Sequence, residues 1–468
     1  YNSAASPPPD IGGYTTMAVP TLPRGRAARR PTASGFLKWI RRFGSSIGRP
    51  VFSVILAIIA GGIVIMITSS GSLGDRFSSA TSAYQALFSG SFGTVQSFSF
   101  TLVTVGPLIL TGISVAIAYR ARLFNVGAEG QLAVGAMVAD IIGIKAGGLP
   151  GWLLIPAMII AAALAGAVWG GIVGFLKGWR GAHEVVTTIM LNWIAFFTTD
   201  YLITGPFKAA SGADSTTPLP AQATLPQLAV LYNNTLGKFL PSIANPTGYL
   251  VDFSIILALL ALVVYWFIMT RTTFGYEVRV IGDNPKAARY AGISLKKNIL
   301  MVMMIAGAFS GMAGAFRLMG QFPYQLIGST FRIDTVGFDA IGVALLGHMT
   351  AIGILFGALL FGGLRQGAGL MQLQAGVPGD LVFIIQALVL FSIASEFLPA
   401  IRRSLSRLPV FNRKPVLATP DRDLMISEVP VSGDGENGSE PAHDDLQNKG
   451  PGEAGEQGLF TSDSPEEK

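Results

Sequence analysis

"VFSVILAIIAGGIVIMITSS", residues 51–70, contains no charged side chain. About 20 residues of apolar helix are enough to cross the hydrocarbon core of a bilayer. Runs of this kind recur along the 468-residue chain, which is 50% hydrophobic and only 13% charged. A soluble domain carries about twice that share of charge. The sequence therefore predicts an all-α polytopic membrane protein.

The apolar runs predict about ten transmembrane helices. We place them at about residues 51–70, 100–119, 125–144, 152–178, 184–204, 250–270, 298–319, 336–349, 351–366 and 376–399. The two runs between residues 336 and 366 are the shortest. The polar, Ser- and Phe-rich stretch after the first run is expected to be a loop.

Positive charge indicates which side of the membrane each connection faces. Basic residues favour the cytoplasmic side of short loops. They gather in the N-terminal arm, at Arg120 and Arg122, at Lys177 and Arg180, in residues 271–297 and in residues 402–414. Ten helices place all of these regions inside, with both termini cytoplasmic and the base-poor segment 205–249 outside.

Composition divides the chain into three parts. Residues 1–49 are rich in Pro and Ser and then basic, and we expect a disordered arm. Residues 50–400 form the transmembrane domain. Residues 401–468 are expected to be a disordered cytoplasmic tail, basic at first and then acidic, with 13 Asp/Glu against three Arg/Lys after residue 420. There is no cysteine, and the three histidines are scattered, so no metal centre is expected.

The stretch "ARLFNVGAEGQLAVGA", residues 121–136, places Asn125, Glu129 and Gln131 among glycines within the apolar region. Its segment "NVGAEG" is echoed 210 residues later by "TVGFDA", where Asp339 takes the place of Glu129. The predicted topology puts the two copies in opposite orientations. This is typical of an inverted repeat, here five helices plus five, whose broken helices enclose a polar site near the membrane midplane.

Ionisable residues inside a membrane are candidates for function. The candidates are Glu129, Asp140, Glu184, Asp200, Asp339, Glu396, His348 and Arg365. Asp140, Asp200 and Glu396 lie near the ends of predicted helices and are expected to reach water. Glu129 and Asp339 lie deeper. Either they accept hydrogen bonds from free N–H groups of a broken helix, or they contact a ligand directly.

A second polar concentration lies in "HEVVTTIMLNWIAFFTTDYL", residues 183–202. Thr188 and Asn192 share a helix face, and Trp193 flanks them. Hydroxyl, amide and aromatic groups together suit a neutral, hydroxylated ligand with a flat face. Interhelical hydrogen bonding is the alternative. Phe331 is a further aromatic candidate: it either stacks on a ligand at the expected outer mouth or belongs to an interfacial aromatic belt.

Two features bear on energy supply and packing. No G-x-x-x-x-G-K-[ST] loop, nucleophile elbow or H-E-x-x-H motif occurs, so we expect neither an enzyme nor a bound cofactor.

Glycines recur every four residues from Gly166 to Gly178, and Gly307 and Gly311 repeat the spacing. We interpret these strips as close helix packing.

The basic segment 271–297 contains "NPKAARYAGIS". Asn284 and Pro285 are typical of a helix start, and Gly292 of a helix end. The short helix between them carries Arg289 and Tyr290. Such a helix is shaped to dock into a groove of a soluble partner; a basic stretch lying on anionic lipid is the alternative.

Four motifs in this order, "FNVGAEGQL", "EVVTTIMLNWIA", "GYEVRVIGDNPKAARYAGI" and "GFDAIGVALLG", resemble permease subunits of bacterial ABC importers. The group is that of ribose, branched-chain amino acid and nucleoside permeases, and the likeness is greatest to the larger permease of nucleoside, or simple-sugar, importers. It covers roughly residues 50–400 and leaves out both tails.

This resemblance implies a permease domain in the bacterial cell membrane that forms the translocation path for nucleosides or related sugars. It implies three partners besides membrane lipid: a second permease subunit, a cytoplasmic ATP-binding subunit and an extracytoplasmic substrate-binding lipoprotein. No nucleic-acid partner is expected. It also implies that the segment with Asn284, Pro285, Arg289, Tyr290 and Gly292 couples the chain to the ATPase. A secondary, proton-coupled transporter that uses the intramembrane carboxylates remains the alternative.

Overall fold

The computed structural model describes residues 33–394, and it describes side chains from residue 51 to residue 393. The predicted tail 401–468, Glu396 and the first 32 residues of the arm lie outside this range. Within it the chain is helical, with isolated β-bridges but no strand. The expected all-α class is therefore confirmed for the described residues.

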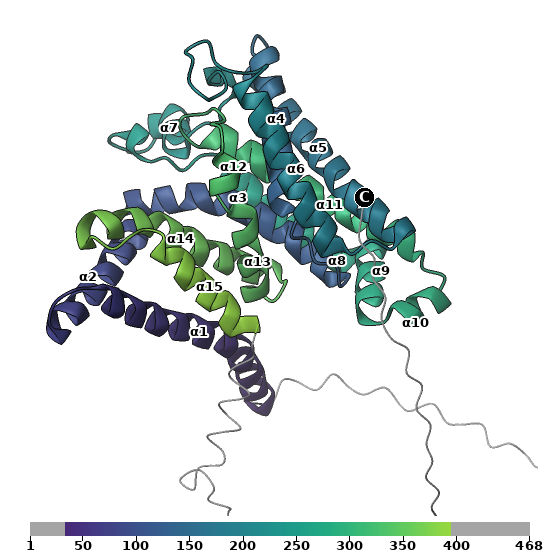
Figure 1. Cartoon of the computed structure of the whole chain (residues 1–468), viewed down its shortest axis with the longest axis horizontal. Helices are drawn as coiled ribbons and strands as arrows, with labels where there is room; N and C mark the ends of the chain where they lie inside the picture. The colour runs from purple at the N-terminus through teal and green to yellow at the C-terminus, as the bar shows by residue number, and fades with distance from the viewer. Residues whose placement is uncertain (1–32, 395–468) are drawn as a thin grey trace, which may run out of the picture. The chain divides into compact units, whose positions relative to one another are not determined.

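The described helices follow one another with short connections, except for the long segment between α6 and α8 that contains α7 (Figure 1). The first eight are α1 (Ala33–Thr68), α2 (Leu73–Phe92), α3 (Val95–Arg120), α4 (Ala128–Lys145), α5 (Gly151–Arg180), α6 (Glu184–Thr204), α7 (Leu228–Asn234) and α8 (Ser254–Arg271). The others are α9 (Thr273–Asp283), α10 (Pro285–Tyr290), α11 (Leu295–Gly320), α12 (Thr330–Ile333), α13 (Val336–Leu346), α14 (Ala351–Ala375) and α15 (Leu381–Ala394). Helix α1 begins within the arm that we expected to be disordered.

Seven helices in the described part are long and apolar enough to cross a membrane: α1 from Val51, α3, α5, α6, α8, α11 and α14. The three other predicted spans also form helices, α4, α13 and α15; α13 has only 11 residues, and 14 residues of α15 fall within the described range. Helix α4 is 18 residues long and contains Glu129, Asp140 and Lys145. The fold is thus multi-pass. Helix α4 departs from a simple apolar span by its charged residues, and α13 by its short length.

The expected loop after the first span is wrong. Residues 73–92 form helix α2, which begins with a capping box between Ser72 and Asp75. Its small buried face, which includes Ala83 and Gly90, packs against α14, and an alanine Cβ at Gly90 would lie 2.8 Å from Leu370 Cβ. The many serines lowered the apolarity of the stretch and hid the three- and four-residue spacing of this face.

Helix α11 packs against α3, α4 and α5, and α4 and α5 also pack against each other; Figure 1 shows these helices together with α6. The glycine strips make the contact, as expected. A Cβ at Gly166 would lie 2.2 Å from Gly307 O, and one at Gly135 would lie 2.4 Å from Gly311 Cα. Such distances allow no side chain, so these backbones touch directly.

The cytoplasmic segment of the predicted topology forms two helices rather than one. The short helix α10 is confirmed: the Asn284 side chain accepts from the N–H groups of Lys286 and Ala287 at 3.0 and 3.1 Å, and Gly292 has φ +78°. The preceding helix, α9, was not expected. Its Gly282 touches the end of α3, since a Cβ there would lie 2.1 Å from Arg120 O.

Candidate functional site

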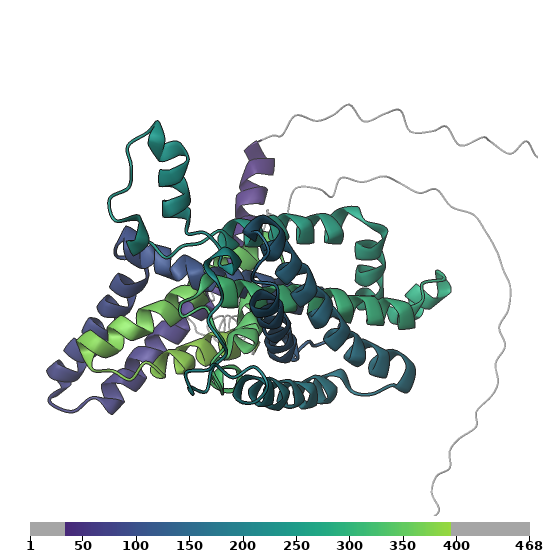
Figure 2. The same ribbon diagram turned by 90° about the horizontal axis from the view of Figure 1, so that it is seen from above.

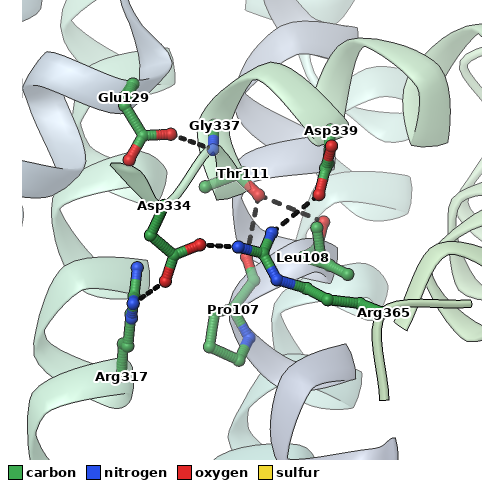
Figure 3. A network of polar contacts seen from close by, with 9 residues as sticks. All are labelled: Pro107, Leu108, Thr111, Glu129, Arg317, Asp334, Gly337, Asp339 and Arg365. Carbon is green, nitrogen blue, oxygen red and sulfur yellow. Dashed lines mark hydrogen bonds and ion pairs between the residues drawn. The ribbon is translucent and has the colours of Figure 1, made fainter. Parts of the chain in front are cut away.

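The N-termini of α4 and α13 meet inside the bundle (Figure 3). Glycines open both helices, and a Cβ at Gly337 would lie 2.4 Å from the Glu129 nitrogen. The Glu129 side chain, in the first turn of α4, accepts a hydrogen bond from Gly337 N at the start of α13. Both helix ends carry the positive end of a dipole and free N–H groups, so a buried carboxylate between them compensates both.

Helix α6 supports the start of α4 through Asn192. Its amide accepts from Gly130 N at 2.9 Å and donates to Val126 O at 3.0 Å. Thr188, one turn earlier on the same buried face, lies against Gly127, where a Cβ would be 3.1 Å from the threonine side chain. Asn192 therefore makes the interhelical hydrogen bonds of the alternative, whereas the Thr188 hydroxyl donates to Glu184 O and Val185 O within α6 and only packs against α4.

Asn125 and Gln131 hold the turn that leads into α4. Each side-chain amide donates to the other, at 2.9 and 3.1 Å, and Asn125 also donates to Ser114 Oγ on α3 at 3.0 Å. Both residues are buried. They pair with each other and fix the turn one step away from Glu129.

Charged side chains continue the site beyond α13, as Figure 3 shows. Asp334, in the loop before α13, pairs with Arg317 of α11 and with Arg365 of α14. Arg365 also pairs with Asp339 at 2.7 Å. We call Glu129, Arg317, Asp334, Asp339 and Arg365 the central polar cluster. The side chains of Arg317, Asp334 and Arg365 keep part of their surface exposed, so one edge of the cluster lies at the surface of this chain.

Arg317 and Asp334 were missed by the sequence reasoning. Arg317 falls close to the end of an apolar helix that the predicted topology directs outward, where a basic residue is unfavourable. This unfavourable position of a positive charge is the feature of the sequence that could have identified Arg317 as a site residue. Asp334 lies outside the predicted spans, and only the fold brings it between the two arginines.

The aromatic candidates separate. Trp193 lies on the outer face of α6, about half exposed, and stacks on Phe197 with ring centroids 5.8 Å apart. Phe331 is buried in α12. Trp193 therefore does not share the buried face of Thr188 and Asn192, and the structure does not bring the two aromatic side chains together.

The other carboxylates differ in their surroundings. Asp200 keeps part of its side chain exposed, pairs with Arg332 at 3.0 Å and accepts from Ser329 N at 2.8 Å. Asp140 is completely buried, so the expectation that it reaches water is wrong. The end of α4 is covered by the loop that contains Leu219, which lies against Gly143.

The fold and the cluster define a polytopic helical membrane protein with a buried polar site at the meeting point of two helix ends. Residues 97–394 match the family model described as the branched-chain amino acid transport system permease component. The chain belongs to this permease family.

Curated relatives extend the similarity over most of the chain. A guanosine ABC transporter permease protein of Bacillus subtilis, NupP, is 38% identical over 77% of this chain and 95% of its own length. A nucleoside ABC transporter permease protein of Lactococcus lactis is 33% identical over 75% of this chain and 91% of its own length. A glucose ABC transporter permease protein of Haloferax volcanii is 34% identical over 75% and 88%. No solved structure matches.

These comparisons decide between the two classes of transporter that the sequence left open. The chain is a transmembrane permease of the ABC class, a transport subunit, and ATP hydrolysis belongs to a separate ATPase subunit. The family match begins at residue 97, so α1 and α2 precede the matched region.

Proposed function

We propose that this chain forms the translocation path for nucleosides or related sugars in an ATP-driven importer. The observation that carries the substrate class is the similarity to permeases named for guanosine, nucleosides and glucose, over about three quarters of the chain. A nucleoside is a neutral, hydroxylated molecule with a flat base. The central polar cluster offers charged hydrogen-bonding groups at its exposed edge, and Phe338 is partly exposed in the same turn of α13 as Asp339.

Within this function, the polar residues have two roles. Asn125, Gln131, Thr188 and Asn192 brace the start of α4, since their side chains bond or pack within the protein. Glu129 joins the two helix ends. Asp339 and Arg365, which pairs with it, lie beside the path and contact the passing solute. Phe331, buried in α12, supports the wall of the path, whereas Trp193 lies on the outer face of α6 and stacks on Phe197 there.

The same proposal includes the topology. Ten helices arranged as an inverted repeat of five plus five are supported by the pairing of α4 with α13, whose N-termini meet head to head and whose sequences echo each other. Both termini are cytoplasmic, as the basic connections favour. Residues 50–400 constitute the permease domain, and the arm and tail flank it.

The partners are a second permease, a cytoplasmic ATP-binding subunit and an extracytoplasmic substrate-binding lipoprotein. Two guanosine ABC transporter permease proteins of Bacillus subtilis, NupP and NupQ, both match this chain, at 38% and 29% identity. A related pair in one organism supports a transporter with two different permeases. Helix α10 couples to the ATPase: its Tyr290 is 93% exposed, and Arg289 is exposed beside it.

Uptake in cells tests the substrate class. A strain that lacks this chain should lose uptake of labelled guanosine, and the restored strain should recover it. Excess unlabelled nucleosides should compete, whereas leucine should not. Unchanged guanosine uptake in the deletion strain, together with loss of leucine uptake, would assign a different substrate class to the path.

A further inference from the structure

The segment that contains α7, residues 226–252, forms a hairpin whose tip exposes apolar side chains. Leu236, Phe239 and Leu240 are 57%, 89% and 53% exposed. Figures 1 and 2 both show α7 standing away from the helical bundle. Large apolar groups gathered at one exposed tip indicate a surface that contacts something.

Internal hydrogen bonds hold this tip in place. The Asn233 side chain accepts from Ile243 N and donates to Ile243 O, both at 2.9 Å. Tyr232 donates its hydroxyl hydrogen to Pro241 O at 3.2 Å. These bonds join residues 232 and 233 to residues 241 and 243. The tip between them, which exposes the apolar side chains, is therefore held in an ordered structure.

The base of the hairpin fixes its level relative to the bilayer. Leu228 N donates to Val251 O at 2.8 Å just before α8 begins, and Gln96 Nε2 donates to Gly248 O at 3.2 Å in the first turn of α3. Both α3 and α8 are candidate membrane spans, so their first residues lie at a membrane surface. The exposed side chains of Val95 and Phe98 on α3 continue the apolar surface beside this base.

The charge of the hairpin points to one kind of occupant. Between residues 226 and 251 the sequence carries a single charged residue, Lys238, between Leu236 and Phe239. A lysine among apolar side chains suits the boundary between headgroups and acyl chains, because its ammonium reaches lipid phosphate while the neighbours enter the apolar layer. Tyr232 and Tyr249 are residues of the type that gathers at this boundary.

We infer that the hairpin is a membrane-interface anchor, whose tip at Leu236, Phe239 and Leu240 inserts into the adjacent leaflet beside α3. The occupant of the apolar tip is phospholipid. The anchor holds the connection between α6 and α8 at the membrane surface, next to the start of α8.

The absence of cysteine from the chain gives a clean test. The variant Phe239→Cys, in the full-length chain, is labelled with bimane and placed in nanodiscs of phosphatidylethanolamine and phosphatidylglycerol that contain doxyl-labelled lipid. Leu260→Cys, exposed on α8, is the lipid-facing reference, and Ser211→Cys, exposed in the connection between α6 and α7, is the aqueous reference. We expect quenching at Phe239 close to that at Leu260 and several-fold stronger than at Ser211.

Leu240→Cys supplies a second position on the same tip. The inference requires lipid quenching at both positions and is overturned if either behaves like Ser211. It is also overturned if both probes stay accessible to aqueous iodide in nanodiscs and become shielded only when the substrate-binding lipoprotein of the transporter is added. That result would make the tip a protein-docking surface.

Discussion

At the scale of single residues, Glu129 explains why a carboxylate stands in an apolar stretch. It accepts from a first-turn N–H group of another helix, and in a membrane each such group left without a partner costs about 2–7 kcal/mol. The sequence predicted this bracing role as one of two alternatives. It did not reveal the partner, because Gly337 is 208 residues away and only the fold brings it near.

Glu129→Gln and Glu129→Leu separate bracing from mere packing. Glutamine keeps an acceptor for Gly337 N, so this variant should assemble and transport about tenfold more slowly, a loss on the order of 1.4 kcal/mol. Leucine leaves the N–H without an acceptor and should prevent assembly. Size-exclusion profiles and uptake rates in proteoliposomes measure both. Wild-type assembly and transport by the leucine variant would show that the stretch only packs.

Asp252, just before α8, predicts a dependence of stability on pH. Burial raises the pKa of Asp252 from its ordinary 3.8 to about 6, and the hydrogen bond from Ser254 N at 2.6 Å only partly opposes this. Between these values the folded state holds a proton that the unfolded state releases. The folded state is therefore favoured as the pH falls, and stability is lost as the pH rises from 3.8 to about 6.

The substitution Asp252→Asn should remove this contribution. The variant should be more stable than the parent near neutral pH, by on the order of 2 kcal/mol, and the difference should vanish below the ordinary carboxyl pKa. Thermal unfolding of the purified chain, followed by tryptophan fluorescence across pH, measures it. Asp214→Asn, on an exposed side chain, is the matched control. Lower stability of the Asp252→Asn variant than of the parent at neutral pH would refute the argument.

At the scale of elements, the sequence predicted a helix correctly where particular residues mark its first and last turns. Asn284, Pro285 and Gly292 located α10 because a cap, a fixed φ and a left-handed glycine each act over one turn. Helix α9 and helix α2 were missed, since both combine short apolar faces with polar or small residues. Their helical state depends on packing against α3, α8 and α14, which a local pattern does not contain.

Helix α10 is the element whose charge should matter for coupling. Arg289→Glu reverses one exposed charge on it and should lower ATP-driven uptake about tenfold, a change of roughly 1.4 kcal/mol, without affecting insertion. Lys297→Glu makes the same change in charge at the start of α11 and should have little effect. Uptake and ATPase activity of the assembled transporter are measured together. Equal behaviour of the two variants would place the coupling contact elsewhere.

At the scale of the whole molecule, hydropathy predicted the class of fold. It did not predict the polar contacts that join the first half of the membrane region to the second. Apolar length identified the long helices, and seven of the described ones satisfy it. The cluster that joins α4, α11, α13 and α14 depends on Arg317 and Asp334, whose significance appears only when these helices lie together. Sequence echoes suggested a relation between α4 and α13, and the structure gives it a contact.

The central claim is that this chain provides a path and draws its energy from another subunit. The direct measurement is guanosine uptake by proteoliposomes that contain this chain with its second permease, ATPase and binding protein, and no ion gradient. We predict that uptake requires ATP on the side of the membrane where the ATPase subunit lies. It should stop with vanadate and be unaffected by a proton ionophore. Uptake by this chain without the ATPase, driven by an imposed proton gradient and abolished by the ionophore, would contradict the account.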